Sequence, residues 1–366
     1  MPLNPEQRQA LRKRCVAIVP GFDTPEPAAE FRQLADWCER HGVAHDTYGK
    51  GALVEDFEQK VATRLGLPTA TFVPSGTMAQ LCALRIWTER KRLSRFAMHP
   101  TCHLANHEEQ AYAALMGCHG VPIGDRLRPL LAGDLDAVAQ ELACLIVELP
   151  IREAGGQLPS WDELEALKSA AQQRGVALHM DGARLWESAA FYGRPHAEIA
   201  RGFDSVYVSL YKGIGAPAGA VLAGDEAFVA SARLWRKRMG GTLYHMSAMV
   251  AAAAMRFDER LALMPALYQR TLALAETLAR CPRLRPNPAT PQANMLHLHF
   301  AAPADVVADA RDRLAEATGW WLFDGVRSTD VPGHSVTEVY VGDRLLALDD
   351  PGLLARFETL CQGFDA

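Results

Sequence analysis

The feature that most constrains this chain is the alternation of short apolar runs with helical segments between about residues 67 and 245. Runs such as ATFV, CLIVE, VALHM and SVYVSL are almost wholly apolar, and amphipathic stretches such as SWDELEALKSAAQQRG separate them. Strands of this kind are buried on both faces, as happens when helices cover both sides of a mostly parallel sheet. We therefore predict an α/β fold with a mostly parallel central sheet and helices on both of its faces.

The pattern changes after about residue 245, where a long helical stretch precedes an alternating strand, another helix and a last strand. A chain of 366 residues suits two domains better than one. We expect a large α/β domain over residues 46–255 and a small α+β C-terminal domain over 256–366. Residues 1–45 are expected to be a helical segment that joins the small domain.

Composition excludes several classes of protein. A net charge of -5 gives no general attraction to nucleic acid or to an anionic membrane. The chain has no apolar run long enough to span a bilayer, and its polar start lacks a signal-peptide core. The eight cysteines have no paired spacing, which is typical of reduced thiols in the cytoplasm. No C-x-x-C or H-E-x-x-H occurs, so we expect no metal site.

Polar residues at strand ends are the first candidates for function, because ligands of open α/β sheets bind beyond the carboxyl ends of strands. Ser75, Gly76 and Thr77 stand between a strand and a helix, where backbone N–H groups suit a phosphate. Asp181 and Lys212 each end an apolar run. Singly, these residues could be a capping turn, an N-cap and a solvated lysine. Together they fit pyridoxal phosphate, which needs an amine to bond its aldehyde and a carboxylate to keep its ring nitrogen protonated.

Longer motifs make this prediction specific. The segments DTYGKG, PSGTMAQ, HLANHE, HMDGAR, YKGIGAPAGAVLAG and LWRKRMGG occur in this order within about residues 46–260. They resemble the motifs of the threonine aldolase/β-eliminating lyase family. That resemblance implies the aspartate-aminotransferase-like fold, known as fold type I of pyridoxal-phosphate enzymes. Because such enzymes build their sites at subunit interfaces, it also implies a homodimer or homotetramer.

The resemblance implies a role for each matching residue. Lys212 would bond to the cofactor, Asp181 would pair with the ring nitrogen, and His103 would stack on the ring and relay protons. The other implied contacts are phosphate binding by Ser75, Gly76 and Thr77, phosphate or substrate-carboxylate binding by Arg184, and a pocket wall from Tyr48, in its own or a neighbouring subunit.

The segment after His103 is less regular than the rest. We expect a helix over residues 107–117, which begins with His107 and Glu108. His107 stands where the family usually has an aromatic residue, so it either lines the site or merely begins the helix.

The chain departs from the family where the substrate would bind. The family's E-N-T-H-N becomes ELPIR at residues 148–152, which keeps Glu148 but loses the polar triplet. Glu338 falls where a late arginine normally holds the substrate carboxylate. Arg152 and Arg327 are the candidate replacements, with a solvated surface position as the alternative for each. The sequence therefore predicts the cofactor more directly than the substrate.

The resemblance implies a pyridoxal-phosphate-dependent lyase. Such an enzyme would cleave the Cα–Cβ bond of a β-hydroxy amino acid, such as L-threonine or L-allo-threonine, into glycine and an aldehyde. Two alternatives stay open. One is β-elimination or another pyridoxal reaction on a different amino acid. The other is a cofactor-binding protein without catalysis, which the absence of a DNA-binding motif or basic tail disfavours.

Overall fold

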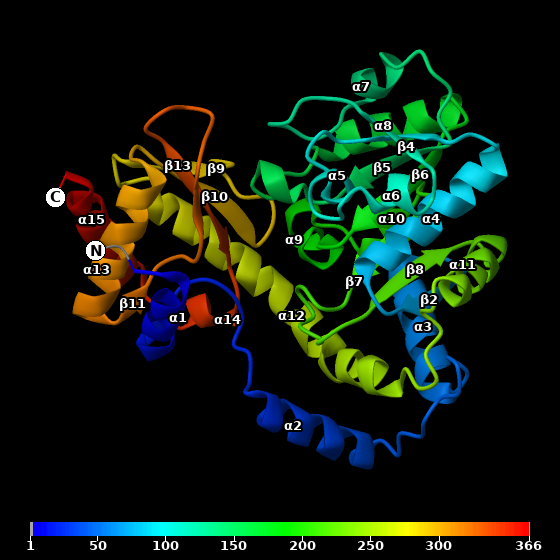
Figure 1. Ribbon diagram of the computed structural model, residues 1–366, viewed down its shortest axis with the longest axis horizontal. Coiled ribbons are helices and arrows are strands. Elements are labelled where there is room, and N and C mark those ends of the chain that lie inside the picture. Colours follow the sequence, from blue (N-terminus) through cyan, green and yellow to red (C-terminus); the bar gives the residue numbers. More distant parts are fainter. Residues whose placement is uncertain (1–2, 366) are drawn as a thin grey trace. The chain divides into compact units, whose positions relative to one another are not determined.

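The computed structural model describes residues 3–365, which form two compact units (Figure 1). The larger unit takes Pro25–Glu153 and Leu158–Leu263. The smaller unit takes the described residues up to Thr24, the segment Ala154–Gln157, and the described residues from Met264 onward. The domain boundaries at residues 45 and 255 stay a prediction, because packing into compact units does not establish which segments fold as domains.

The larger unit is built on a seven-stranded sheet with the order β2-β8-β7-β6-β5-β3-β4. β8 runs antiparallel to its two neighbours, whereas the pairings among β7, β6, β5, β3 and β4 are parallel. The predicted α/β fold with a mostly parallel central sheet is therefore confirmed. The strands are β2 (Thr69–Val73), β3 (Arg95–Met98), β4 (His119–Pro122), β5 (Cys144–Glu148), β6 (Ala177–Gly182), β7 (Ser205–Ser209) and β8 (Ala220–Gly224).

One face of this sheet packs against helices α4 (Gly76–Lys91) and α11 (Glu226–Arg238). Leu84 of α4 and Phe228 of α11 are fully buried there, together with Ile146 and Leu222 of the sheet. Each such side chain contributes about 1.5–3 kcal/mol of hydrophobic stabilisation. This packing excludes water from the face that also carries the polar strand-end residues.

Local sequence signals set the helix ends in the larger unit. The Ser160 hydroxyl accepts a hydrogen bond from the Glu163 N–H, and the Glu163 carboxylate accepts one from the Ser160 N–H, which forms a capping box. α3 ends at Gly66, whose φ of +66° suits glycine. The other helices of the larger unit that precede α12 (Ser247–Leu278) are α2 (Pro27–Arg40), α3 (Ala52–Leu65), α5 (His103–Asn106), α6 (Ala111–Ala114), α7 (Ala132–Asp136), α8 (Trp161–Gln173), α9 (Ala189–Tyr192) and α10 (His196–Ala200).

The long helix predicted after residue 245 is α12 (Ser247–Leu278). It passes from the larger unit to the smaller one after Leu263, and Pro265 lies just beyond that point. Its 32 residues exceed the length needed to span a bilayer. None of the helices within residues 3–365, however, combines that length with enough apolar character to cross a membrane.

The smaller unit contains an antiparallel sheet with the order β12-β13-β10-β9 and a parallel pair, β1 with β11. The β1–β11 pair ties the start of the chain to this unit. The strands are β1 (Ala17–Ile18), β9 (Leu284–Asn287), β10 (Met295–Phe300), β11 (Trp320–Trp321), β12 (Val326–Ser328) and β13 (Ser335–Tyr340). The helices are α1 (Pro5–Arg14), α13 (Ala304–Thr318), α14 (Asp343–Leu346) and α15 (Asp350–Gln362).

Asp46 connects two segments of the larger unit that are 200 residues apart. Its Oδ1 accepts hydrogen bonds from the N–H groups of Met246 and Ser247, and its Oδ2 accepts one from Gly49, each at 2.7 Å. Because α12 begins at Ser247, the carboxylate also faces the positive end of a helix dipole. Burial acts to raise the pKa of Asp46, but these N–H donors outweigh it and lower the pKa.

We expect Asp46→Asn to lower the free energy of unfolding by about 2 kcal/mol at pH 7, because it removes the charge that these N–H groups bind. A carboxyl with a lowered folded-state pKa stabilises fully above its unfolded-state pKa and loses that effect as the pH falls through the folded-state value. Urea unfolding of both proteins at successive pH values measures the difference. It should shrink below about pH 5. A difference that stays constant with pH would contradict the role of the charge.

Candidate active site

A row of three polar side chains crosses the sheet near the carboxyl ends of its strands. Glu148 is the last residue of β5, and its Cα pairs with that of Asp181 on β6. Asp181 pairs in turn with Tyr207 on β7. Residues paired in this way point to the same face of a sheet, and all three are at most 8% exposed. They lie on the face that packs against α4 and α11, because Ile146, two residues before Glu148, is part of that core.

Lys212 follows β7 by three residues and is partly buried beside this row. Desolvation, together with the nearby positive charge of Arg184, lowers the pKa of its amine to about 8. The negative charges of Asp181 and Glu148 act in the opposite direction. The result is an amine that is partly neutral near physiological pH, which is the form that attacks a carbonyl carbon.

The two acids of the row are both difficult to ionise without a ligand. Burial raises the pKa of Glu148 to about 7, and the charge of Asp181 contributes to the rise. Burial also raises the pKa of Asp181, while Lys212 and an N–H donor from Ala183, 3.1 Å from Oδ1, act to lower it. Two like charges this close cannot both form without a high cost, so a cation brought by a ligand would stabilise one of them.

The N-terminus of α4 lies directly against this row. Ser75 is the N-cap, and its hydroxyl accepts a hydrogen bond from the Met78 N–H at 3.3 Å. Gly76 begins the helix, and a Cβ at this position would lie 2.6 Å from the Tyr211 hydroxyl and closer still to that of Tyr207. The two hydroxyls are 3.3 Å apart. Free N–H groups, two hydroxyls and a missing side chain together form a cradle for an anion. Thr77 is the next residue of the helix and is partly exposed.

His103 begins α5 and is held by a carboxylate. Its Nδ1 lies 3.0 Å from Oε1 of Glu108, which is 8% exposed. A carboxylate on Nδ1 keeps the ring proton there and leaves Nε2 as a proton acceptor. The charge of His103 affects the pKa of Asp181, so the imidazole lies near the row.

The helix predicted over residues 107–117 is wrong at both ends. Only Ala111–Ala114 forms a helix, and the preceding Glu109 and Gln110 have φ values of +49° and +53°. This left-handed turn is unfavourable for side chains other than glycine. It accompanies the burial of Glu108 against His103, a contact outside the local helical pattern.

His107 lies next to His103 on the solvent side and is exposed. Its ring centroid is 5.1 Å from that of His103, and its Nε2 is 3.1 Å from Oε1 of Glu153. Glu153 in turn lies 3.6 Å from the guanidinium of Arg152. The backbone N–H of Arg152 donates to Oε1 of Glu148 at 3.1 Å, so the end of the ELPIR segment folds back on its first residue, which is part of the row.

The remaining predicted residues are distributed unevenly. Arg184 lies close enough to Lys212 to affect its pKa. Tyr48 is 55% exposed, and its ring contacts Tyr244 with centroids 5.3 Å apart. Arg327 lies on β12 of the smaller unit. Of these three residues, Arg184 lies near the row, because its charge acts on Lys212 and on Glu148.

Two tyrosines at this site were not identified from the sequence. Tyr207 and Tyr211 flank the α4 N-terminus, and Tyr211 directly precedes Lys212. The segment YVSLYK has its tyrosines four residues apart, so a strand would place both on one face. That spacing was a usable signal for a pair of hydroxyls next to the lysine.

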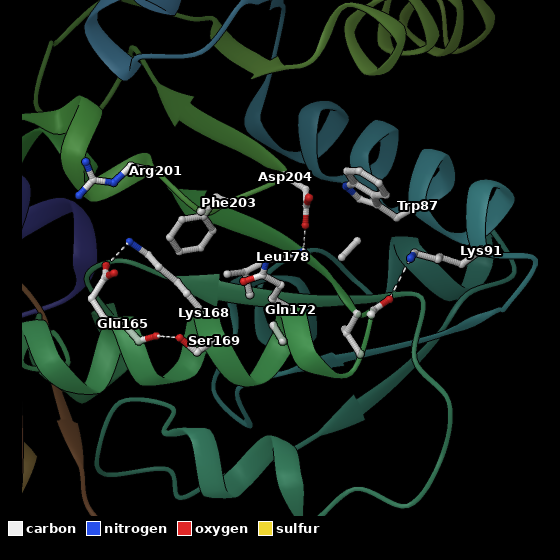
Figure 2. Close-up of a pocket in the computed structure, with 15 residues that line it drawn as sticks. Trp87, Lys91, Glu165, Lys168, Ser169, Gln172, Leu178, Arg201, Phe203 and Asp204 are labelled. Carbon is white, nitrogen blue, oxygen red and sulfur yellow. Dashed lines mark hydrogen bonds and ion pairs between the residues drawn. The ribbon is translucent and has the colours of Figure 1, made fainter.

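A separate cavity of about 500 Å³ lies at the opposite edge of the sheet, where β6 and β7 begin (Figure 2). Its charged groups already bind protein atoms. Lys168 Nζ donates to Glu165 Oε1 at 2.8 Å and to the Ile199 carbonyl at 3.1 Å. Lys91 Nζ donates to the Gly175 carbonyl at 2.8 Å. Ligands of such sheets bind beyond the carboxyl ends of the strands, whereas this cavity lies at the amino ends of β6 and β7. We therefore assign the candidate site to the row.

The row fits pyridoxal 5'-phosphate. The buried carboxylate of Asp181, the amine of Lys212 beside the row and the cradle at Gly76 match the ring nitrogen, aldehyde and phosphate of that cofactor. A side chain at residue 76 would collide with the hydroxyls of Tyr207 and Tyr211, so glycine lets both hydroxyls approach the helix N-terminus. Within residues 3–365, no group of three His, Cys, Asp or Glu side chains is arranged to hold a metal ion.

Proteins of known sequence and structure resemble this chain closely. Low-specificity L-threonine aldolase 1 of Arabidopsis thaliana is 28% identical over 297 residues, which cover 77% of this chain and 82% of that protein. The low specificity L-threonine aldolase of Escherichia coli K12 is 29% identical over 247 residues, which cover 64% of this chain and 72% of that protein.

Solved structures agree with these relatives. A candidate L-allo-threonine aldolase from Listeria monocytogenes EGD-E superposes with a TM-score of 0.92 at 34% identity, over 98% of this chain and 99% of that one. The threonine aldolase of Leishmania major, at 18% identity and a TM-score of 0.71 over 90% of this chain and 95% of that one, shares the fold. The family model for beta-eliminating lyases matches residues 32–301. Since this match covers well over half of the 366 residues, the chain belongs to the beta-eliminating lyase family.

Proposed function

We propose that this protein is a pyridoxal-phosphate-dependent aldehyde-lyase. It cleaves the Cα–Cβ bond of a β-hydroxy amino acid of the L-threonine or L-allo-threonine type and releases glycine and an aldehyde. The observation that carries this proposal is the partly neutral amine of Lys212 beside the buried carboxyl of Asp181, in a chain whose relatives are named threonine aldolases. When bound, pyridoxal phosphate stabilises the negative charge that develops at Cα.

Asp181 of the row and the residues beside the row would hold the cofactor. Lys212 supplies the amine that bonds to its aldehyde, and Asp181 keeps the proton on its ring nitrogen. Ser75, Gly76 and Thr77 bind its phosphate through the N-terminus of α4, where the helix dipole favours an anion. The hydroxyls of Tyr207 and Tyr211, which lie against Gly76, support this assignment.

His103 would stack on the cofactor ring and accept the proton of the substrate's β-hydroxyl. Because Glu108 occupies Nδ1, the Nε2 atom accepts that proton as the Cα–Cβ bond breaks. Arg184 receives the substrate carboxylate or the cofactor phosphate, which its position beside Lys212 supports. Arg152 and Tyr48 complete the substrate pocket. Arg152 is supported by its backbone contact with Glu148, and Tyr48 by the family motif alone.

The protein is also a cytoplasmic homo-oligomer, a dimer or a homotetramer, with no nucleic-acid partner. Its eight cysteines are free thiols, which supports a reducing compartment. Tyr48 and Tyr244 expose 55% and 59% of their surface, which supports a contact with another subunit. Light scattering of the purified protein measures the number of subunits.

A screen for glycine release tests the proposed reaction. We expect glycine and the matching aldehyde from L-threonine, L-allo-threonine or a related β-hydroxy amino acid. Pyruvate and ammonia from L-serine, without glycine from any substrate, would assign β-elimination instead. That alternative has support, because a structure 36% identical to this chain, from Exiguobacterium sp. 255-15, is described as both an aromatic amino acid beta-eliminating lyase and a threonine aldolase. A bound cofactor with no turnover would leave only cofactor binding.

Lys212→Ala should abolish the visible absorbance band that a lysine-bound cofactor gives. We expect glycine release to fall by on the order of 10³-fold or more, because the residue acts covalently. Lys91→Ala is the matched control, since Lys91 contacts the Gly175 carbonyl at the opposite edge of the sheet. Retention of the band in Lys212→Ala would assign the amine to another lysine.

Gly76→Ala should weaken cofactor binding at least about tenfold, because the new methyl group would collide with both tyrosine hydroxyls and displace the helix start. Titration of the cofactor-free protein by visible absorbance measures this affinity. Gly133→Ala adds the same methyl group in another helix, where nothing lies within 4 Å, and should leave the affinity unchanged. Equal affinities of the two variants would remove Gly76 from the phosphate site.

Glu108→Gln should lower kcat by on the order of tenfold or more, because the carboxylate orients His103 for proton transfer. Glu108 is a positioning residue, so its effect should depend on the imidazole. In a double-mutant cycle, Glu108→Gln added to His103→Ala should therefore cost little more than His103→Ala alone. Steady-state glycine release from all four proteins gives the cycle. Full additivity would show that Glu108 acts without His103.

A further inference from the structure

Glu148 has an oxygen that lacks a partner. Its Oε1 accepts the Arg152 N–H, but its Oε2 is buried and has no hydrogen-bond partner within residues 3–365. Leaving a buried carboxyl oxygen unsatisfied costs about 1–3 kcal/mol, and more when the group is charged. The residue lies in the row with Asp181, so the missing partner belongs to whatever ligand the row binds.

The order of the row matches the order of groups around the cofactor ring. Tyr207 stands on the side of Gly76, where the phosphate binds, and Asp181 stands in the middle, where it pairs with the ring nitrogen. Glu148 stands on the far side of Asp181. In pyridoxal phosphate, the arm that carries the phosphate and the ring hydroxyl lie on opposite sides of the axis through the ring nitrogen. Two groups of the cofactor lie on the Glu148 side, the ring methyl and the ring hydroxyl. Of these, the hydroxyl is the one whose oxygen can form a hydrogen bond with a carboxyl group.

The charges in the row determine whether Glu148 or the oxygen on the cofactor ring carries the proton of their hydrogen bond. Asp181 has to be ionised to hold a protonated ring nitrogen, and a second carboxylate beside it is strongly disfavoured. Environments that push the pKa values of two neighbouring acids apart assign one of them as the ion and the other as the neutral acid. A neutral carboxylic acid is a hydrogen-bond donor, whereas its ionised form only accepts.

We propose that Glu148 stays protonated when the cofactor is bound and donates a hydrogen bond from Oε2 to the oxygen on the cofactor ring. Cofactor binding is then linked to the uptake of a proton at Glu148. This inference rests on the proposed function only in requiring that pyridoxal phosphate binds in the row. It adds a proton-dependent control of loading that the family motifs do not contain.

The pKa of Glu148 in the cofactor-free protein determines how cofactor affinity should change with pH. Burial raises the pKa of Glu148 to about 7, so the group is mostly neutral below pH 7 and mostly ionised above it. If only the neutral form binds the ring oxygen, loading above pH 7 takes up a proton and becomes weaker by about tenfold per pH unit. Other titratable or charged groups lie near the row and are the same in the wild type and in the variants described below. They are Cys102, His103, Glu108, Asp181, Arg184, Glu187, Tyr207 and Lys212.

Glu148→Gln tests the contribution of Glu148 protonation to cofactor affinity, because glutamine keeps the shape and a hydrogen-bond donor but does not titrate. Pyridoxal phosphate is titrated into the cofactor-free wild-type and variant proteins, and visible absorbance gives the affinity from pH 6 to pH 9. We expect similar affinities at pH 6 and a wild-type affinity about tenfold weaker than that of the variant at pH 8. A pH indicator in weak buffer should record close to one more proton taken up by the wild type at pH 8. The control is Glu153→Gln, the same change at a carboxyl that pairs with His107, which should behave as wild type.

A second measurement needs no variant. The cofactor analogue that lacks the ring hydroxyl should bind the wild type without the extra proton uptake, because Glu148 then has no oxygen to contact. Parallel pH dependences of the wild type and Glu148→Gln, or equal proton uptake with the analogue and the natural cofactor, would overturn the inference. If the wild type gives no visible band at all, the proposed function fails as well, which distinguishes the two.

Discussion

The chemistry of this site depends on the register between three parallel strands. The pairing of β5, β6 and β7 puts Glu148, Asp181 and Tyr207 in one row on one face of the sheet. A shift of one residue in β5 would turn Glu148 to the other face and leave Asp181 without its neighbour. Two adjacent buried carboxyls are unfavourable by themselves. The nearby positive charges of Lys212 and Arg184 offset part of this cost.

The packing that stabilises the larger unit also positions the polar groups of the candidate site. α4 and α11 cover the face that carries the row, and the start of α4 meets that row at Gly76. The helix therefore contributes its buried apolar side chains to the core and its N-terminal N–H groups to the site. Because both contributions come from one rigid element, a change that shifts α4 should affect stability and cofactor binding together.

The sequence predicted the parts of this structure that depend on local pattern. Alternating apolar runs and helices predicted the sheet, and Asp181 and Lys212 were identified because each follows an apolar run. The proximity of Glu148 to Asp181 could not be predicted, because it depends on which strands are neighbours and on their register. The helix over residues 107–117 was predicted from periodicity alone, whereas Glu108 turns toward His103 through a contact that periodicity does not contain. The roles of all these residues stay predictions until they are tested.

The position of Lys212 has a consequence for the catalytic cycle. Asp181 and Glu148 belong to strands, whereas Lys212 lies between β7 and β8, in a segment with Gly215 at φ +75° and Gly219 at φ +104°. In the proposed function, the substrate's amino group would replace the Lys212 amine on the cofactor, so this amine would have to move in each turnover. The group that would move thus lies on a glycine-containing loop, whereas the two acids that would contact the ring lie in paired strands. Movement of the lysine would therefore leave Asp181 and Glu148 in place.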